Sequence, residues 1–217
     1  GLGVIRDMAI AYYLGARFAG EAFVVAFRIP NLLRGLLAEG SLTVSFIPVF
    51  TDYLSTRSRQ EADRLVNVIF SFLLVALVLS TVLGIFFAPW IVMAISPGFL
   101  DHPEKLDLTI RLTRFLFPFI FFAGLVALCM GVLNSLGHFA APALAPVFLN
   151  LCMIGSIVFL TSYFQEITTA LAVGVLLGGA VQLLFQLPFL RKKEIRLRID
   201  FDVFHPGARQ VGKLVLP

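Results

Sequence analysis

Charged residues are scarce in this sequence. Only 14% of its 217 residues are Asp, Glu, Lys or Arg, and 59% are hydrophobic. Ordinary soluble domains carry about 25% charged and roughly 45–50% apolar residues. A soluble domain of this length has too few polar groups to cover so much apolar surface. The composition therefore excludes a soluble globular protein and predicts an integral membrane protein surrounded by lipid.

Residues that carry catalysis or bind metals are scarce as well. His102, His138 and His205 are scattered through loops and the tail, and no HExxH, Gly-x-Ser-x-Gly or Walker motif is present. The cysteines, Cys129 and Cys152, lie in apolar stretches, which favours buried free thiols over a disulfide or a metal site. We therefore expect no active site, no metal and no cofactor.

Apolar runs near 20 residues, the length that spans a hydrocarbon core of about 30 Å, follow one another along the chain. They predict about six transmembrane helices, at residues 1–14, 18–53, 65–95, 108–136, 142–163 and 168–190. The first run is too short to span and indicates the end of a truncated helix. The second is loosened at Glu39 and Gly40, and a polar loop (55–64) and an acidic loop (101–107) separate later helices. The domain prediction is a transmembrane lobe at 1–190 and a basic, then amphipathic, segment at 191–217.

The ends of the chain and its basic loops indicate context and orientation. The sequence has neither an initiator Met nor a signal-peptide layout, so we expect a piece of a longer protein. The loops at 55–64, 137–141 and 191–198 alternate onto one side, and Lys and Arg concentrate in the first and last of them. The positive-inside rule makes that side, and the N-terminus, cytoplasmic. The pI near 9.4 then indicates contact with lipid head groups rather than nucleic acid.

The most informative charges lie inside the second apolar run. At 100° per residue, Glu21, Arg28 and Arg34 fall within about 80° of Asn31 on one helical face. Apolar residues fill the opposite face, which is typical of a helix that lines a wet cavity. Because an intramembrane Arg costs at least about 2.5–3.5 kcal/mol, it is a functional hypothesis by default. Guanidinium groups suit phosphate oxygens, so we expect an anionic or phosphorylated substrate.

A structural interpretation stays open for these charges. Arg28 and Arg34 can reach an interface with their flexible side chains, or form ion pairs with Glu21 and Glu39. Arg6 and Asp7, in the first helix, can pair locally with other residues in the same way. In either case the charged groups stabilise the helices and contact no substrate.

Several stretches resemble a known family. They are Arg6-Asp7, Gly15-Ala16, the run from Glu21 to Arg34 (EAFVVAFRIPNLLR), Ala38-Glu39-Gly40, Phe46-Ile47-Pro48, Ala88-Pro89-Trp90, Pro97-Gly98-Phe99, Leu133-Asn134, Ala145-Pro146, Leu149-Asn150 and Gln186-Leu187-Pro188. Together they closely resemble the first part of the MurJ (MviN) family, the lipid II flippases of bacterial peptidoglycan synthesis. The resemblance runs the whole chain.

The resemblance implies a fold and a site. The fold is the N-terminal lobe of the multidrug/oligosaccharidyl-lipid/polysaccharide exporters, followed by a cytoplasmic linker (191–217) toward a missing second lobe. Arg6 and Arg34 match cavity arginines that hold the lipid-linked diphosphate in the family, and Asn31 and Glu39 match cavity or near-cavity positions. The Ser-Arg pair that usually precedes this start is missing. Glu21 stands where relatives often have Asp, so a closely placed contact there is in doubt.

The expected function is flipping of lipid II across the bacterial inner membrane by alternating access, with no transport by one lobe alone. The candidate substrate-binding residues are Arg6, Glu21, Arg28, Asn31, Arg34 and Glu39. Rival interpretations are an exporter of the same fold for another lipid-linked sugar or a drug, a membrane enzyme acting on lipid-linked substrates, and a structural subunit that encloses no cavity.

Overall fold

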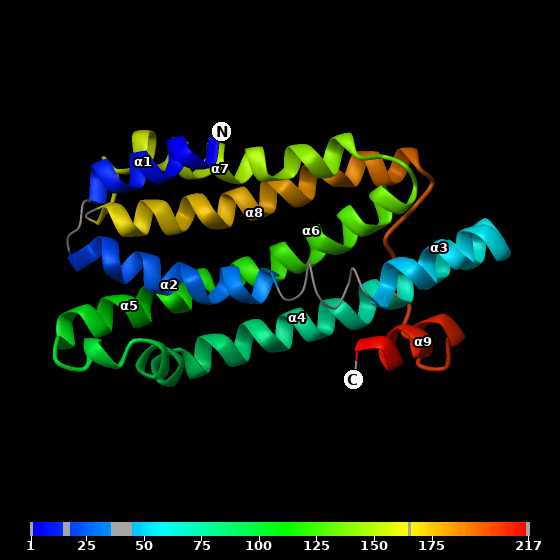
Figure 1. The fold of residues 1–217 in the computed structure, drawn as a ribbon, viewed down its shortest axis with the longest axis horizontal. Helices are drawn as coiled ribbons and strands as arrows, with labels where there is room; N and C mark the ends of the chain where they lie inside the picture. The colour runs from blue at the N-terminus through cyan, green and yellow to red at the C-terminus, as the bar shows by residue number, and fades with distance from the viewer. Residues whose placement is uncertain (1, 15–17, 36–44, 165, 216–217) are drawn as a thin grey trace.

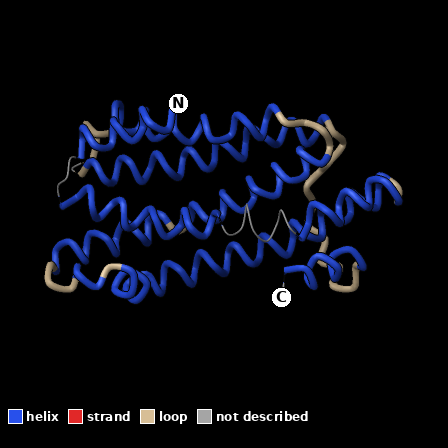
Figure 2. The backbone as a smooth tube through the Cα atoms, viewed as in Figure 1, coloured by secondary structure: helices blue, strands red, loops and turns tan. Residues whose placement is uncertain are grey.

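The computed structural model describes residues 2–14, 18–35, 45–164 and 166–215 of the chain. Over these residues the chain folds into helices joined by short loops, without a strand (Figure 2). The elements are α1 (Leu2–Leu14), α2 (Phe18–Gly35), α3 (Ile47–Thr56), α4 (Arg59–Ile95), the short 3-10 helix η2 (Pro97–Phe99), α5 (Pro103–Leu116), α6 (Pro118–Ser135), α7 (Ala140–Leu160), α8 (Ile167–Lys192) and α9 (Pro206–Val215).

The long helices lie side by side in a bundle, and their connections alternate between its two ends. In Figure 1 the α3–α4, α6–α7 and α8–α9 connections lie at one end, and the α4–α5 and α7–α8 connections at the other. The loops for which the sequence predicts a common side are therefore gathered at a common end. Which end faces the cytoplasm stays a prediction from the distribution of cations.

Four spans in the described residues are long and apolar enough to cross a membrane: Arg59–Ile95, Pro103–Ser135, Ala140–Leu160 and Ile167–Lys192. Along α4, large apolar side chains such as Leu79, Val82 and Phe86 are more than half exposed, as lipid-facing residues are. The predicted all-α membrane architecture is confirmed. Of the six predicted helices, α1 is only 13 residues long and α2 carries charges along its length, so neither meets the length and composition of a span.

The structure corrects three predicted boundaries at the loops. The polar loop expected at 55–64 shrinks to two residues, because the side chain of Ser58 and that of Glu61 form a reciprocal capping box that starts α4 at Arg59. Most of the acidic loop expected at 101–107 is helical, because Pro103 occupies the first turn of α5. The single helix expected at 108–136 divides after Leu116, where Pro118 lacks the N–H that would continue the hydrogen-bond ladder.

Small residues allow α8 to approach its neighbours closely. A Cβ added at Gly174 would lie 2.2 Å from Ser156 Oγ, and one at Gly178 would lie 3.0 Å from the Cα of Leu149, both on α7. The two glycines are four residues apart, the small-xxx-small spacing that brings membrane helices together. On another side of α8, a Cβ added at Gly179 would lie 3.0 Å from Cβ of Phe122 and 3.1 Å from Cδ2 of Phe119, both on α6. α8 is therefore held tightly between α6 and α7.

The tail after α8 folds back along α4 instead of extending away from the bundle. Backbone N–H groups donate to α4 side chains in three hydrogen bonds: Arg196 to Asp63 Oδ1 (3.3 Å), Arg198 to Asn67 Oδ1 (2.7 Å) and Asp200 to Ser71 Oγ (2.7 Å). Residues 195–200 are called the extended segment below. Arg64 of α4 also forms ion pairs with Asp200 and Asp202, at 3.3 and 3.1 Å. α9 then packs against α3 and α4.

Candidate functional site

Arg6, Asn31 and Arg34 line one cavity of about 300 Å³. α1 contributes Arg6, and the last two turns of α2 contribute Asn31 and Arg34. The remaining wall comes from α6, α7 and α8: Ala123, Val126, Ala127, Met130, Ala145, Pro146, Leu149, Asn150 and Gln182, with Phe27 of α2. The helical periodicity of α2 places Asn31 and Arg34 on one face, and the fold brings Arg6 to the same space.

Arg34 is half-buried, and a neighbour on the same helix orients its side chain. Its Nε donates a hydrogen bond of 3.1 Å to Oδ1 of Asn31, one turn earlier. In the described part of the chain no carboxylate pairs with this guanidinium. Its terminal N–H groups thus remain for an anion, and the planar fork of Arg suits two phosphate oxygens.

Arg6 is paired locally, with its neighbour Asp7. Its Nε and Nη2 both donate to Oδ1 of Asp7, at 2.9 and 2.7 Å. The Asp7 side chain is 64% exposed, whereas that of Arg6 is 24% exposed and lines the cavity. Exposure weakens the ion pair by solvent screening. Asp7 therefore orients Arg6 and neutralises part of its charge without taking all of its N–H donors.

A second cavity, of about 490 Å³, adjoins the first and contains Arg28. The two share Arg6, Phe27 and Asn31, and Asp7 and Arg28 line only the second. Arg28 is exposed and, among the described residues, has no carboxylate partner. Of the predicted site residues on α2, Asn31 therefore lies between the space that Arg34 faces and the space that Arg28 faces.

Glu21 lies outside both cavities. Its carboxylate forms an ion pair with Nζ of Lys105, at the first turns of α5, and the Lys105 ammonium also lies 4.2 Å from the centre of the Phe99 ring. Glu21 thus links α2 to α5 and lines neither cavity, because the face of α2 at that level meets α5. A role for Glu21 in substrate binding stays a prediction. Glu39, the remaining predicted site residue, lies outside the described residues.

Two further residues line the cavity that the sequence pattern did not predict there: Asn150 and Gln182. Asn150 Nδ2 donates to the carbonyl of Pro146 (2.9 Å), while its buried Oδ1 has no partner in the described structure. Gln182 Nε2 donates to the carbonyl of Ala145 (2.7 Å). An amide side chain in a largely apolar run is a signal available in the sequence for both. Periodicity within one helix gives no means to place them opposite Arg34.

The cavity combines cationic and amide groups on an otherwise apolar wall. Within the described residues, no group of three His, Cys, Asp or Glu side chains stands close enough to hold a metal ion. Such a wall can bind an anion together with sugar or amide groups, since guanidinium groups contact oxyanions and Asn and Gln both donate and accept hydrogen bonds. The presence of a cavity also disfavours a subunit whose polar helix face only packs against other helices.

Comparisons with known proteins agree with this picture. The sequence model of the family described as "Lipid II flippase MurJ" matches residues 10–217. A probable lipid II flippase MurJ of Buchnera aphidicola is 42% identical over 216 residues, covering 100% of this chain and 42% of the relative. The lipid II flippase MurJ of Burkholderia cenocepacia is 36% identical over 219 residues, covering 99% and 42%.

A solved structure, "Lipid II flippase MurJ, inward closed conformation", has the same fold over 99% of this chain. The TM-score is 0.75, the identity is 23%, and the match covers 44% of the solved chain. The chain thus spans about two fifths of the length of the relatives that it matches. The lobe architecture expected from the resemblance is confirmed at the level of the fold.

Proposed function

Because the chain belongs to the lipid II flippase MurJ family, we propose that it is one lobe of a transporter that flips lipid II, the lipid-linked peptidoglycan precursor, across the bacterial inner membrane. The observation that carries this proposal is the cavity lined by Arg6, Asn31 and Arg34. That the chain is a multi-pass membrane protein of this family rests on its four candidate spans and on its relatives.

The diphosphate of the substrate is the group that the two arginines bind. Arg34, oriented by Asn31, offers two parallel N–H donors, and Arg6 contributes further N–H groups from the facing helix. In a site shielded by apolar helices these contacts are stronger than in water. Asn150 and Gln182 add hydrogen bonds to the sugar or peptide part of the head group. The protein breaks no bond, so it is a transporter and not an enzyme.

Transport needs a second lobe in addition to the one formed by residues 1–217. Two lobes rocking about a site near the membrane midplane expose the head group first to the cytoplasm and then to the outer face, while the lipid tail stays in the bilayer. One lobe has no partner to rock against, so residues 1–217 alone do not transport. In this arrangement the N-terminus and the basic segment 191–217 are cytoplasmic, and that segment leads toward the second lobe.

Two other substrates of the same fold are less favoured than lipid II. A cationic drug is disfavoured because Arg6 and Arg34 would repel it. Another polyprenyl-diphosphate-linked sugar has the same anionic group, and the cavity residues alone do not distinguish it from lipid II. Family membership favours lipid II.

The test is to replace Arg34 in the full-length protein. Arg34→Ala should abolish complementation of a flippase-depleted bacterium, while the amount in the membrane stays near normal because the helix becomes more apolar. Arg34→Lys should also lose most of the activity, because an ammonium is a point charge without the planar fork. Arg111→Ala, which removes an exposed cation of α5 paired with Asp107 at 3.1 Å, is the matched control and should complement.

Two results would count against the proposal. If the Arg34→Ala protein disappears from the membrane, Arg34 is structural. If it complements as the unchanged protein does, the cavity does not bind the substrate through this residue. Full activity of the Arg34→Lys protein would show that this position provides a general electrostatic attraction and not bidentate hydrogen bonding.

A further inference from the structure

The largest cavity described, about 700 Å³, lies away from the Arg34 cavity, at the end of the bundle where the cations gather. One wall is apolar and comes from three helices: Phe70 of α4, Leu125 of α6, and Leu183, Leu187 and Leu190 of α8. The other wall is the end of α8 and the extended segment: Arg191, Ile195, Arg196, Leu197 and Arg198. The cavity is thus apolar on one side and cationic on the other.

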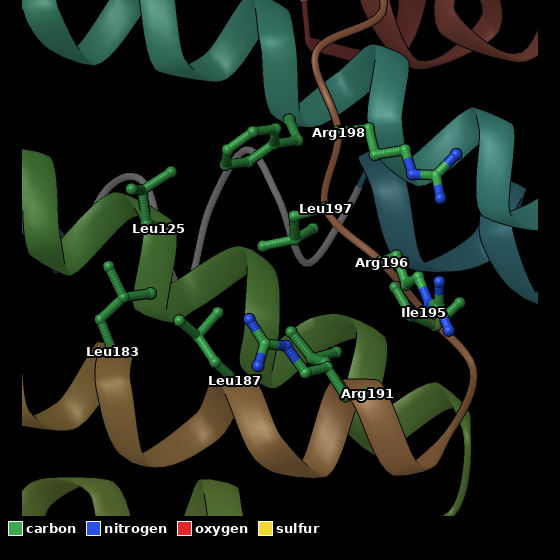
Figure 3. A pocket seen from close by; sticks show the side chains of 10 residues that line it. Leu125, Leu183, Leu187, Arg191, Ile195, Arg196, Leu197 and Arg198 are labelled. Atoms are coloured by element: carbon green, nitrogen blue, oxygen red, sulfur yellow. The ribbon is translucent and has the colours of Figure 1, made fainter.

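Figure 3 shows how the cationic wall is arranged. Arg191 reaches from the last turn of α8 toward the space that Leu187 and Leu197 also face. Arg196 and Arg198 project to the opposite side of the extended segment from Leu197, so they border the rim of the cavity and their side chains point away from the space that Leu197 faces (Figure 3). This alternation is that of extended backbone, in which successive side chains point to opposite sides.

These three arginines have no carboxylate to neutralise them within the described residues, where ion pairs form at Arg6, Arg64, Lys105 and Arg111. The contrast with Arg64 is informative, because Arg64 lies beside the same segment and pairs with both Asp200 and Asp202. The acidic residues of the tail are therefore used to hold the segment to α4. The rim arginines remain available to an external anion.

The backbone of the rim is also fixed in place. The N–H groups of Arg196 and Arg198 donate to Asp63 and Asn67 of α4, and Ile195 is buried at 1% exposure. The arginines therefore project from an anchored segment. Anchoring reduces the entropy that binding would otherwise cost.

The tail beside the cavity has the composition of a membrane interface. Ile199, Phe201 and Phe204 are 66%, 53% and 75% exposed, and the guanidinium of Arg209 lies 5.0 Å from the centre of the Phe204 ring. Exposed apolar and aromatic residues next to cations are typical of segments lying among lipid head groups. The composition of the tail beside the cavity therefore suits the head-group region of a bilayer.

We propose that this cavity binds an anionic phospholipid of the bilayer, with its phosphodiester at Arg191 and an acyl chain along Leu125, Leu183 and Leu187. Basic pockets between helices on the cytoplasmic side are suited to such head groups. The site is separate from the Arg34 cavity and does not depend on lipid II being the transported substrate.

Lipid retention by the purified full-length protein tests the proposal. Delipidated protein in detergent receives equal amounts of phosphatidylglycerol and phosphatidylethanolamine with identical chains, and the lipid that co-elutes in gel filtration is quantified. The unchanged protein should retain the anionic lipid preferentially. Each cation near a head group contributes about fivefold, so Arg191→Gln should reduce this preference about fivefold. The triple Gln variant of Arg191, Arg196 and Arg198 should reduce it little further, because the side chains of Arg196 and Arg198 point away from the cavity.

Two control variants distinguish binding in the cavity from a general attraction of anionic lipid to the basic surface. Lys192→Gln removes the neighbouring cation, which does not line the cavity, and should leave the preference unchanged. Leu183→Phe fills the apolar wall without changing charge and should also lower retention of the anionic lipid. Excess inorganic phosphate should fail to displace the lipid, since phosphate has no chain to bury.

Three outcomes would overturn the proposal. They are an unchanged preference in both Arg191→Gln and Leu183→Phe, an equal loss in Lys192→Gln, and displacement by inorganic phosphate, which would indicate a site for free anions. If the triple variant fails to fold, the two single variants decide. The Arg34→Ala protein should retain the lipid normally even without complementation, so this test fails or succeeds independently of the proposed flipping.

Discussion

Asn150 and Gln182 face the same cavity from neighbouring helices, yet their amide groups are satisfied to different degrees. Gln182 donates to a carbonyl of α7, which ties α8 to α7. Asn150 donates to its own helix and leaves its Oδ1 without a partner among the described groups. A buried unsatisfied oxygen costs stability, about 1–3 kcal/mol, and a substrate that donates to it would recover this.

We expect Asn150→Leu to lower transport several-fold without lowering thermal stability. Leu has nearly the same shape and removes the unsatisfied oxygen, so the melting temperature should stay unchanged or rise. Gln182→Leu, the matched variant, loses an interhelical hydrogen bond and should destabilise by about 1 kcal/mol. Melting curves in detergent and complementation by the full-length protein measure both effects. Equal destabilisation by the two variants would show that Asn150 is structural.

The sequence predicts the part of this site that one helix carries. Asn31 and Arg34 are three residues apart, so periodicity alone puts them on one face. The partner of Glu21, by contrast, is Lys105, 84 residues away, and no local pattern reveals which helix meets α2 at that level. Asn150 and Gln182 were missed for the same reason: their convergence depends on how α7 and α8 pack, which hydrophobic periodicity does not specify.

At the scale of elements, glycine determines how closely α4 approaches the junction of α5 and α6. A Cβ added at Gly84 would lie 1.9 Å from Cε1 of Phe117, whose side chain is 2% exposed. Phe117 sits at the break between α5 and α6 that the single predicted helix did not include. The packing of α4 and the position of this break are therefore coupled.

Gly84→Ala should destabilise the protein by about 1–3 kcal/mol, because the buried Phe117 ring must move. Gly155→Ala is the control, since nothing lies within 4 Å of the added methyl group on α7. It should stabilise by up to about 1 kcal/mol, since Ala favours helix more than Gly. Thermal unfolding of both variants in the same detergent distinguishes them. A Gly84→Ala protein as stable as the unchanged one would contradict the close packing.

His205 gives the docking of α9 a pH dependence. Its ring is buried near Tyr53 (ring centres 6.0 Å apart), and its Nδ1 accepts from the N–H of Ala208 at 3.4 Å. Burial and the nearby Arg64 lower the pKa of His205 below its usual 6.5, against opposing effects of Asp202, Asp200 and Glu61. The neutral ring is thus the form that the docked helix favours.

The sign follows from proton binding. Below pH 6.5 a released His205 binds more protons than the docked one, so docking weakens as the pH falls from 6.5 toward the lowered pKa. Hydrogen exchange of residues 206–215 should accelerate over this range relative to that of α8. In His205→Asn, which keeps an acceptor but does not titrate, the pH dependence should disappear. Persistence of the effect in that variant would assign it to other groups.

At the scale of the whole molecule, the grouping of loops at two ends allows orientation to be tested. Gln60, in the first turn of α4, lies at the end that we expect to be cytoplasmic, and Gly98, in η2, lies at the other. Both are exposed. With Cys129 and Cys152 replaced by Ala, an impermeant maleimide should label Gly98→Cys in intact spheroplasts and Gln60→Cys only after permeabilisation. The reverse pattern would invert the proposed topology.

The hydrogen bonds between the extended segment and α4 pair every second residue of the segment with every fourth residue of the helix, and these two spacings differ in length. Four residues of an α-helix advance 6.0 Å, whereas two residues of extended chain advance about 6.6–6.8 Å. Donors and acceptors therefore drift apart by roughly 0.7 Å at each step. The contact at Asp63 is already 3.3 Å, against 2.7 Å at the other two, and the next position on α4 in this series is Val75, which offers no acceptor.

The spacing of acceptors along α4 does not match the spacing of donors along the extended segment, so the hydrogen-bonded contact between them cannot be long. Donors on the segment can face acceptors on α4 over a few residues only, so a longer extended segment could not form hydrogen bonds to α4 along its whole length. Sliding the segment by one residue would turn its N–H groups away from α4, and sliding it by two would leave one donor facing Val75. The tail consequently has a single register on α4. Because a fixed number of residues separates the extended segment from α9, this register also fixes the position of α9.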